Sequence, residues 1–123
     1  AELFLPAGSH GPAFLQFENI AVIRKYNNAD SYALGVALLA ERLAGRSDLH
    51  RPWPVDLEML TLEEAREMQT ALNRLGHAAG EVDGIIGRGT RRSVQRFQIA
   101  QGLLADGFPT RAVYRAIMEA ARR

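Results

Sequence analysis

The second half of the chain carries apolar residues at the three- and four-residue spacing of a helix. The first such series consists of Ala65, Met68, Leu72 and Leu75. Thr61 precedes the series, and Glu64 stands three positions after it, a pattern in which each side chain bonds the other residue's free backbone N–H. Gly76 is the kind of residue that commonly ends a helix. We therefore expect an amphipathic helix between residues 61 and 76.

Two further helices are predicted after glycine-rich turns. The second should have Thr90 as its N-cap, bury Val94 and Phe97, and end near Gly102. The third should be capped by Thr110 and present an inward face made of Val113, Ile117 and Ala120. Residues 61–123 are thus predicted to form a three-helix bundle, a size that is small but workable for independent folding.

The same turn chemistry precedes both of these helices. Asp83-Gly84 comes before the second helix and Asp106-Gly107 before the third. In such pairs the carboxylate bonds nearby backbone N–H groups and the glycine can adopt a positive φ. The two turn-helix units therefore form a weak internal repeat.

Residues 1–46 follow a different pattern. Two short apolar runs, ELFLP and AFLQF, are separated by AGSHGP, which predicts a β-hairpin. A short helix should span Glu18–Tyr26, and a longer one should begin with Ser31 or Asp30 as N-cap and end at Gly45. The fold class expected for the whole chain is therefore mainly α.

The longer helix is apolar on almost every side from Tyr32 to Ala40. A helix of that kind must be buried all round, and a two-stranded hairpin is barely stable alone. Forty-six residues cannot cover both. We expect residues 1–46 to be the tail of a larger domain whose earlier part is missing from this sequence.

Residues 47–60 are predicted to form a Pro-rich linker between the two parts. Pro52-Trp53-Pro54 cannot continue a helix, and prolines hold such a segment extended. We expect few contacts to cross from residues 1–46 to residues 61–123. Trp53 is expected to fold back onto a flanking part, with stacking on a sugar ring as the alternative.

Charge and composition narrow the function only slightly. The chain has 123 residues, no cysteine and a net charge of +1, and no apolar run is long enough to cross a bilayer. No basic and apolar leader opens it, so a signal peptide is absent or already removed. From Arg88 to the end of the sequence there are eight arginines and only two acidic residues, Asp106 and Glu119. This excess of positive charge favours an anionic partner, or else it is an ordinary solvated surface. The three histidines show no ligand spacing, so neither a metal nor a cofactor is expected.

Residues 61–123 resemble the type 1 peptidoglycan-binding domain. The resemblance rests on the series Gly80-x-x-Asp83-Gly84-x-x-Gly87-x-x-Thr90-x-x-Ser93-Val94-x-x-Phe97-Gln98 and on the later Ala-Asp-Gly-Phe-Pro turn. It implies that this module binds a glycan strand or a stem peptide. Candidate binding residues are Asp83, Arg88, Arg91, Arg92 and Tyr114. The arginines suit carboxylates, although turn and core roles account equally well for most residues of the signature.

Residues 1–46 resemble the end of the catalytic domain in lytic murein transglycosylases of the membrane-bound B type. The matching residues run from Leu5-Pro6-Ala7-Gly8 and Gly11-Pro12-Ala13-Phe14-Leu15 to Asn19–Ile23, Tyr26-Asn27 and Ser31-Tyr32-Ala33-Leu34, and on to Leu39-Ala40. This resemblance implies that a β-hairpin and two helices form the tail of a lysozyme-like α+β domain. It also implies that Tyr26, Asn27, Ser31 and Tyr32 lie at the substrate cleft, an ordinary helix junction being the alternative.

Members of this family cleave the MurNAc–GlcNAc bond of peptidoglycan with one glutamate and leave a 1,6-anhydro product. That glutamate is followed by serine, and no Glu-Ser pair occurs here. We expect the chain alone to be catalytically inactive, and to anchor a transglycosylase to the cell wall during wall turnover. The resemblance implies the periplasm or cell envelope of a Gram-negative bacterium, possible outer-membrane association of the parent protein, and membrane contact only through a lipid anchor on that parent.

Two alternatives remain open. The basic helix with Arg91, Arg92 and Arg96 could belong to a nucleic-acid-binding bundle. That hypothesis does not explain residues 1–46, and we do not expect nucleic acid as a partner. Phosphate binding would weaken steeply with salt, which distinguishes it from sugar binding. The other alternative is an oligomerisation fragment, because residues 1–46 expose apolar surface unless something covers it.

Overall fold

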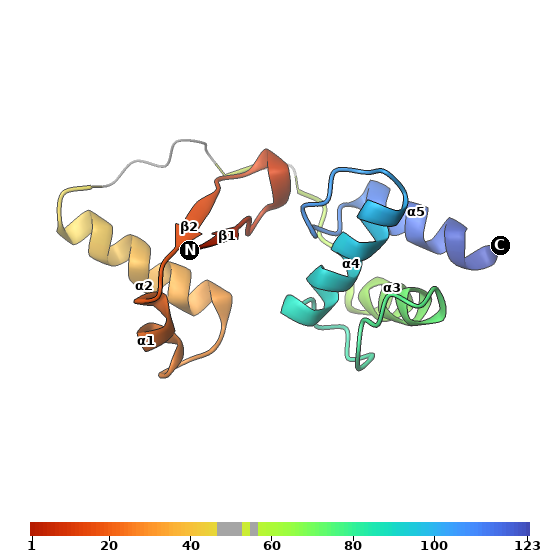
Figure 1. The fold of residues 1–123 in the computed structure, drawn as a ribbon, viewed down its shortest axis with the longest axis horizontal. Coiled ribbons are helices and arrows are strands. Elements are labelled where there is room, and N and C mark those ends of the chain that lie inside the picture. Colours follow the sequence, from red (N-terminus) through yellow and green to blue (C-terminus); the bar gives the residue numbers. More distant parts are fainter. Residues whose placement is uncertain (47–52, 55–56) are drawn as a thin grey trace.

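Two parts of the chain lie side by side in a computed structural model, which describes residues 1–46, 53–54 and 57–123 (Figure 1). The first part contains strands β1 (Glu2–Phe4) and β2 (Phe14–Gln16), a short 3-10 helix η1 (Gly8–His10), and helices α1 (Ile20–Arg24) and α2 (Asp30–Leu43). The second contains α3 (Leu62–Arg74), α4 (Arg88–Ala100) and α5 (Arg111–Arg122). The mainly helical class predicted from the sequence is confirmed. The proposed linker falls largely on residues 47–52 and 55–56, which lie outside the described residues.

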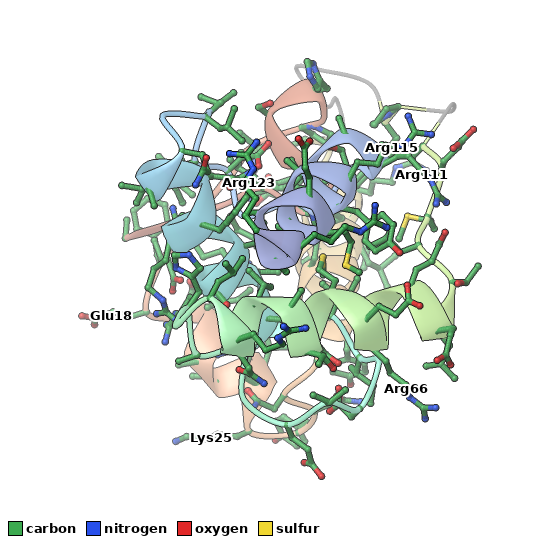
Figure 2. The ribbon with its side chains drawn as sticks, turned by 90° about the vertical axis from the view of Figure 1, so that its right-hand side faces the viewer. Glu18, Lys25, Arg66, Arg111, Arg115 and Arg123 are labelled. Carbon is green, nitrogen blue, oxygen red and sulfur yellow. The ribbon has the colours of Figure 1, made fainter. Side chains whose placement is uncertain are left out.

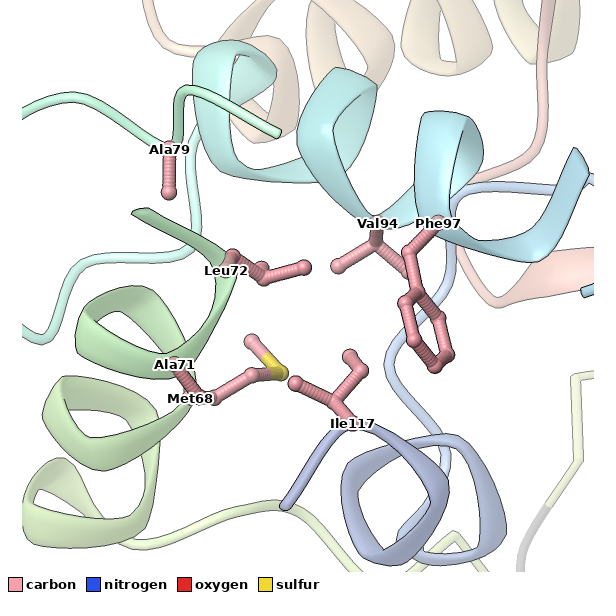
Figure 3. Close-up of a cluster of buried hydrophobic side chains, with 7 residues drawn as sticks. All are labelled: Met68, Ala71, Leu72, Ala79, Val94, Phe97 and Ile117. Atoms are coloured by element: carbon pink, nitrogen blue, oxygen red, sulfur yellow. The ribbon is translucent and has the colours of Figure 1, made fainter. Parts of the chain in front are cut away.

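The core of the second part is built from all three of its helices (Figure 3). Met68 and Leu72 from α3, Val94 and Phe97 from α4, and Ile117 from α5 are each at most 1% exposed. All members of this buried cluster belong to residues 61–123. The second part thus has a hydrophobic core of its own.

The ends of these helices follow the predicted capping in two cases of three. The capping box is confirmed, because Thr61 N–H donates to Glu64 Oε2 at 2.8 Å and Glu64 N–H donates to Thr61 Oγ1 at 3.2 Å. Thr110 caps α5 by accepting from Val113 N–H at 3.2 Å. The prediction for Thr90 was wrong, since Gly87 is the N-cap of α4. Thr90 is buried, and its hydroxyl accepts from Gln69 Nε2 at 3.1 Å, so a tertiary contact takes the oxygen that a cap needs.

Each Asp-Gly turn is held by a buried glutamine from the preceding helix. Gln69 Nε2 donates to Asp83 Oδ1 at 3.0 Å, and Gln69 Oε1 accepts from Gly84 N–H at 2.8 Å. Gln98 makes the same pair of bonds to the second turn, to Asp106 Oδ1 at 2.9 Å and from Gly107 N–H at 2.8 Å. The two turns are therefore equivalent in structure as well as in sequence.

The first part matches the predicted order of elements. β1 and β2 pair antiparallel, with Leu3 opposite Leu15. The N-cap prediction for α2 was wrong, because Ala29 is the N-cap and Asp30 already lies in the first turn. Its C-terminal end agrees with the prediction, since the helix stops at Leu43 and Gly45 follows with a φ of +79°. Trp53 lies against β2, with its ring centroid 6.3 Å from that of Phe14.

Helix α2 buries little of its apolar surface. Ala33 and Leu34 are buried, whereas Leu39 is 59% and Leu43 81% exposed. The described residues leave this face uncovered, which is the outcome that the hydrophobic pattern led us to expect for residues 1–46 by themselves. Figure 1 shows that the second part lies on the other side of the hairpin from α2.

Candidate functional site

The first turn of α4 faces the connection between α1 and α2. Arg88 Nη2 donates to the backbone oxygen of Asn28 at 3.1 Å and to its Oδ1 at 2.9 Å. Arg88 Nε also lies 3.2 Å from Asp30 Oδ1, and Arg24 Nη2 lies 2.8 Å from the same oxygen. Asp30 thus joins a cation from each part of the chain.

Arg91, one turn further along α4, is packed against the first part. Its guanidinium carbon lies 5.8 Å from the ring centroid of Phe4 and 5.6 Å from that of Phe108, within the range of a cation–π contact. Its Nη2 donates to the backbone oxygen of Leu5. Burial lowers the pKa of Arg91, although the charges of Asp30 and Asp106 oppose that shift. Arg91 is therefore a packing residue between the two parts.

The second Asp-Gly turn contacts η1. Ser9 N–H donates to Asp106 Oδ2 at 2.9 Å, while Asp106 Oδ1 accepts from Phe108 N–H at 2.9 Å. Burial acts most strongly and raises the pKa of Asp106, but the hydrogen bonds from Phe108, Gln98 and Ser9 outweigh it and leave that pKa below its ordinary value.

Close packing at Gly8 completes the junction. Its φ is +74°, and a Cβ atom at this position would lie 2.8 Å from Cβ of Phe108. The expectation that few contacts would cross between the two parts was therefore wrong. Linker composition predicts the stiffness of the linker, but it says nothing about the complementarity of the surfaces that the linker joins.

A cavity of about 250 Å³ opens at this junction. Its walls include Glu2, Gln16, Arg24 and Asp30 from the first part and Arg88, Arg91, Arg92 and Asp106 from the second. Of these, Arg92 is exposed and Gln16 is 8% exposed. The junction therefore has room for a small polar ligand.

The four predicted cleft residues lie in or beside the α1–α2 connection. Tyr26 is 85% exposed and Tyr32 43% exposed, and Ser31 is exposed as well. Asn27 Oδ1 accepts from Ala29 N–H at 3.0 Å, so this side chain shapes the turn before α2. Arg88 contacts Asn28 and Asp30, which stand between these residues in the sequence. The structure thus brings the predicted cleft motif beside the first arginine of α4.

Comparison with known families accounts for both parts. Residues 61–117 match the family described as a putative peptidoglycan binding domain, and residues 1–41 match the transglycosylase SLT domain. This chain contains the C-terminal end of an SLT transglycosylase domain followed by a peptidoglycan-binding domain. We refer below to residues 1–46 as the SLT part and to residues 61–123 as the peptidoglycan-binding domain.

Two solved structures resemble the chain over most of its length. Both are crystal structures of SltB3 from Pseudomonas aeruginosa, one in complex with NAG-anhNAM-pentapeptide and one with NAG-NAM-pentapeptide. Each is 43% identical, with TM-scores of 0.81 and 0.82, and covers 94% of this chain. The chain spans 31% of the SltB3 chain in each. A search of the curated proteins found no match.

Two predicted binding residues lie away from the junction. Asp83 is exposed, and the bonds from Ile85 N–H and Gln69 hold its pKa below the ordinary value. The Tyr114 hydroxyl donates to Glu67 Oε2 at 2.7 Å, and this bond raises the pKa of Tyr114. Glu67 lines an open groove of about 430 Å³ between α3 and α5, together with Arg66, Thr70, Arg74, Met118 and Arg122. Contact of Asp83 or Tyr114 with peptidoglycan stays a prediction.

The remaining arginines of α4 have different surroundings. Arg96 donates to the backbone oxygens of His77 and Ala78, at 2.7 Å and 3.2 Å. Arg92 and Arg96 are both exposed, but Arg91 is packed against the first part and the Arg96 guanidinium is already hydrogen-bonded to backbone oxygens. The arrangement does not favour a nucleic-acid interface.

Gln16, Arg24 and Asp30 line the junction cavity but were not predicted from the sequence as site residues. A signal was present for Gln16, because strand alternation places it on the same face as Phe14, where a polar residue is unexpected. No comparable signal exists for Arg24, which meets Gln16 and Asp30 only after the hairpin and α1 pack together. Among the described residues, no helix has the length and apolar character needed to span a membrane.

Proposed function

We propose that this chain binds peptidoglycan through residues 61–123 and thereby places an SLT transglycosylase domain on the cell wall. The observation that carries the proposal is the docked arrangement of the two parts. Arg91 packs between Phe4 and Phe108, and Asp106 accepts from Ser9, so the binding domain is held against the SLT part. A docked binding domain would orient the substrate as well as retain it.

The ligands of the two solved relatives support the proposed substrate class. The two SltB3 crystals contain disaccharide pentapeptides, NAG-anhNAM-pentapeptide and NAG-NAM-pentapeptide. By extension, a glycan strand with stem peptides is the proposed ligand of this chain. The parent enzyme would cleave the MurNAc–GlcNAc bond with a 1,6-anhydro product, in the periplasm or envelope of a Gram-negative bacterium. Any membrane attachment would come from a lipid anchor on that parent.

Tyr26, Asn27, Ser31 and Tyr32 are proposed to contact the sugar near the reacting bond. Tyr26 and Tyr32 are exposed, which supports the proposal. The chemistry supports it as well, because the amide of Asn27 and the two phenols can hydrogen-bond sugar hydroxyls, and the aromatic rings can pack on sugar faces. The glutamate that performs the cleavage in this family has no counterpart in these 123 residues, since none of their glutamates precedes a serine.

Within the peptidoglycan-binding domain, two surfaces are candidates for glycan contact. One is the junction cavity, which is lined by the exposed Arg92 together with Arg88 and Arg91. The other is the groove between α3 and α5, beside Tyr114, whose wall carries Arg66 on the outside of α3 (Figure 2). Asp83 belongs to neither wall, and its hydrogen bonds support a role in holding the loop before α4.

Co-sedimentation with purified sacculi tests the proposal. The full chain should pellet with insoluble peptidoglycan, and the bound fraction should fall far less with salt than DNA binding would, because sugar and stem-peptide contacts release few counterions. Chitin, a glycan without stem peptides, and double-stranded DNA serve as competitors. The proposal fails if the folded chain stays in the supernatant, or if DNA rather than soluble muropeptide displaces it.

A further inference from the structure

The junction cavity contains a hydrogen-bond donor that the protein does not use. Gln16 Oε1 accepts from Arg24 Nη2 at 2.9 Å, and this bond settles which end of the amide is the oxygen. Gln16 Nε2 lies at the other end, in the wall of the cavity, on a side chain that is only 8% exposed. Among the described residues it has no hydrogen-bond partner, and neither has Arg24 Nε. Buried donors of this kind are rare, because leaving them unpaired costs stability.

Asp30 Oδ1 accepts no hydrogen bond among the described residues, but it lies between two cations. Asp30 lies within ion-pair distance of Arg24 and Arg88, and Asp106 accepts from Ser9, Gln98 and Phe108. Glu2 is exposed at the mouth, where solvent and salt screen its charge. The donors in this wall without a partner among the described residues are Gln16 Nε2 and Arg24 Nε, and Arg92 is an exposed cation at its rim.

We propose that this cavity binds a carboxylate of the peptidoglycan stem peptide, with Gln16 Nε2 and Arg24 donating to it and Arg92 supplying charge at the rim. A carboxylate has two acceptor oxygens, so it can accept from both of these unpartnered donors, and Arg92 favours its negative charge. This inference rests on the proposed function and adds the part of peptidoglycan that is recognised.

The position of the cavity has a consequence for specificity. Gln16 and Arg24 come from the SLT part and Arg92 from the peptidoglycan-binding domain. The carboxylate site is complete only when the two parts are docked. The peptide would then be held between the binding domain and the cleft motif at Tyr26-Asn27, which fixes the register of the glycan strand.

Isothermal titration of the full chain with three probes tests this assignment. The probes are a stem pentapeptide, the same pentapeptide with all its carboxylates converted to amides, and the peptide-free disaccharide. The pentapeptide should bind through this site, whereas amidation should weaken binding about ten-fold or more, the effect of losing a hydrogen bond to a charged group. The disaccharide should not compete for the site.

Two variants locate the site. Gln16→Glu keeps an acceptor for Arg24 while replacing the free donor with a negative charge, so pentapeptide binding should fall about ten-fold or more. Arg92→Ala should weaken it as well, and its exposure makes unfolding a minor concern. Arg115→Ala, an exposed arginine on the outside of α5, is the matched control and should bind as the unaltered chain does (Figure 2).

The outcomes separate this inference from the proposed function. Equal binding of the amidated peptide, competition by the disaccharide, or undiminished binding by both variants would overturn the carboxylate site. If these variants still pellet with sacculi while pentapeptide binding is unaffected, only the inference is lost. If the unaltered chain does not pellet at all, the proposed function fails first. Should Gln16→Glu lower the melting temperature, the result for Arg92→Ala decides.

Discussion

The backbone N–H of Ser9 donates a 2.9 Å hydrogen bond to Oδ2 of Asp106, across 97 positions of sequence. The same carboxylate holds its own turn through Oδ1, which accepts from Phe108 and Gln98. One side chain thus shapes a loop of the peptidoglycan-binding domain and attaches that loop to the SLT part. Asp83 occupies the equivalent place in the first turn, where its bonds go to Ile85 and Gln69 within the domain.

Acid should loosen this junction. The pKa of Asp106 is lowered in the folded chain, so the charged carboxylate is the form that the fold favours. Its contribution is present above the unfolded-state value, near 3.8, and is lost as the pH falls through the lower folded-state value. Asp106→Asn should therefore reduce the melting temperature at neutral pH and flatten its decline below about pH 4.

Asp83→Asn is the matched control for that experiment. The pKa of Asp83 is lowered too, but its partners all lie in the peptidoglycan-binding domain. This variant should lower the stability of the domain without separating it from the SLT part. Small-angle scattering at neutral pH can measure the separation. An unchanged radius of gyration in Asp106→Asn, or an equal expansion in both variants, would contradict the role given to Ser9 and Asp106.

Gly8 should be intolerant of any side chain. Gly8→Ala places Cβ 2.8 Å from Cβ of Phe108 and also forces alanine into a φ of +74°. Backbone strain of that kind costs about 1–3 kcal/mol, and the clash adds to it. Gly45→Ala has a φ of +79°, and no atom of the described residues lies within 4 Å of the new Cβ, so it isolates the strain. Chemical denaturation should show a larger loss for Gly8→Ala than for Gly45→Ala, and equal losses would mean that the junction is not tightly packed.

The features that could be predicted from the sequence are those decided within a few residues. Thr61 and Glu64 stand three apart and satisfy each other, and Asp106 bonds a backbone N–H two residues away. Thr90 was misjudged because Gln69, 21 positions earlier, takes its hydroxyl. Likewise the partners of Arg91 stand far from it in sequence, and nothing in an arginine-rich helix indicates that one arginine will be packed against Phe4. Long-range contacts of this kind have no local signal.

The cleft motif could be placed on the α1–α2 connection from the resemblance alone. Its contact with Arg88 could not be predicted from the sequence, because that contact depends on how the two parts dock. The residues of the proposed carboxylate site, Gln16 and Arg24, were missed for the same reason. Composition indicated an anionic partner, and only packing distinguishes the exposed Arg92 from the engaged Arg88 and Arg91.

The 123 residues should release no product from sacculi. The family's single catalytic glutamate, which acts as acid and then as base, is followed by serine, and no glutamate of these 123 residues precedes a serine. Incubation with purified sacculi, followed by chromatography of the soluble fraction, should give no 1,6-anhydromuropeptide above a blank. A muramidase provides the positive control for substrate quality. Appearance of the anhydro product would mean that another carboxylate, such as Glu18 or Glu41, performs the reaction.

The isolated segment 61–123 should fold and pellet with sacculi without the SLT part. Its buried cluster is complete within these residues, and its first and third helices carry their own caps. Phe97→Ala should unfold it, because emptying a buried aromatic site costs about 3–5 kcal/mol, comparable to the whole stability of so small a domain. Ile99→Ala, at a position 64% exposed on the same helix, should leave the melting temperature nearly unchanged. Loss of the junction should, however, remove the preference for carboxylate-bearing peptide, since Gln16 and Arg24 are absent. A folded 61–123 segment that never pellets would show that binding belongs to the junction and not to the domain alone.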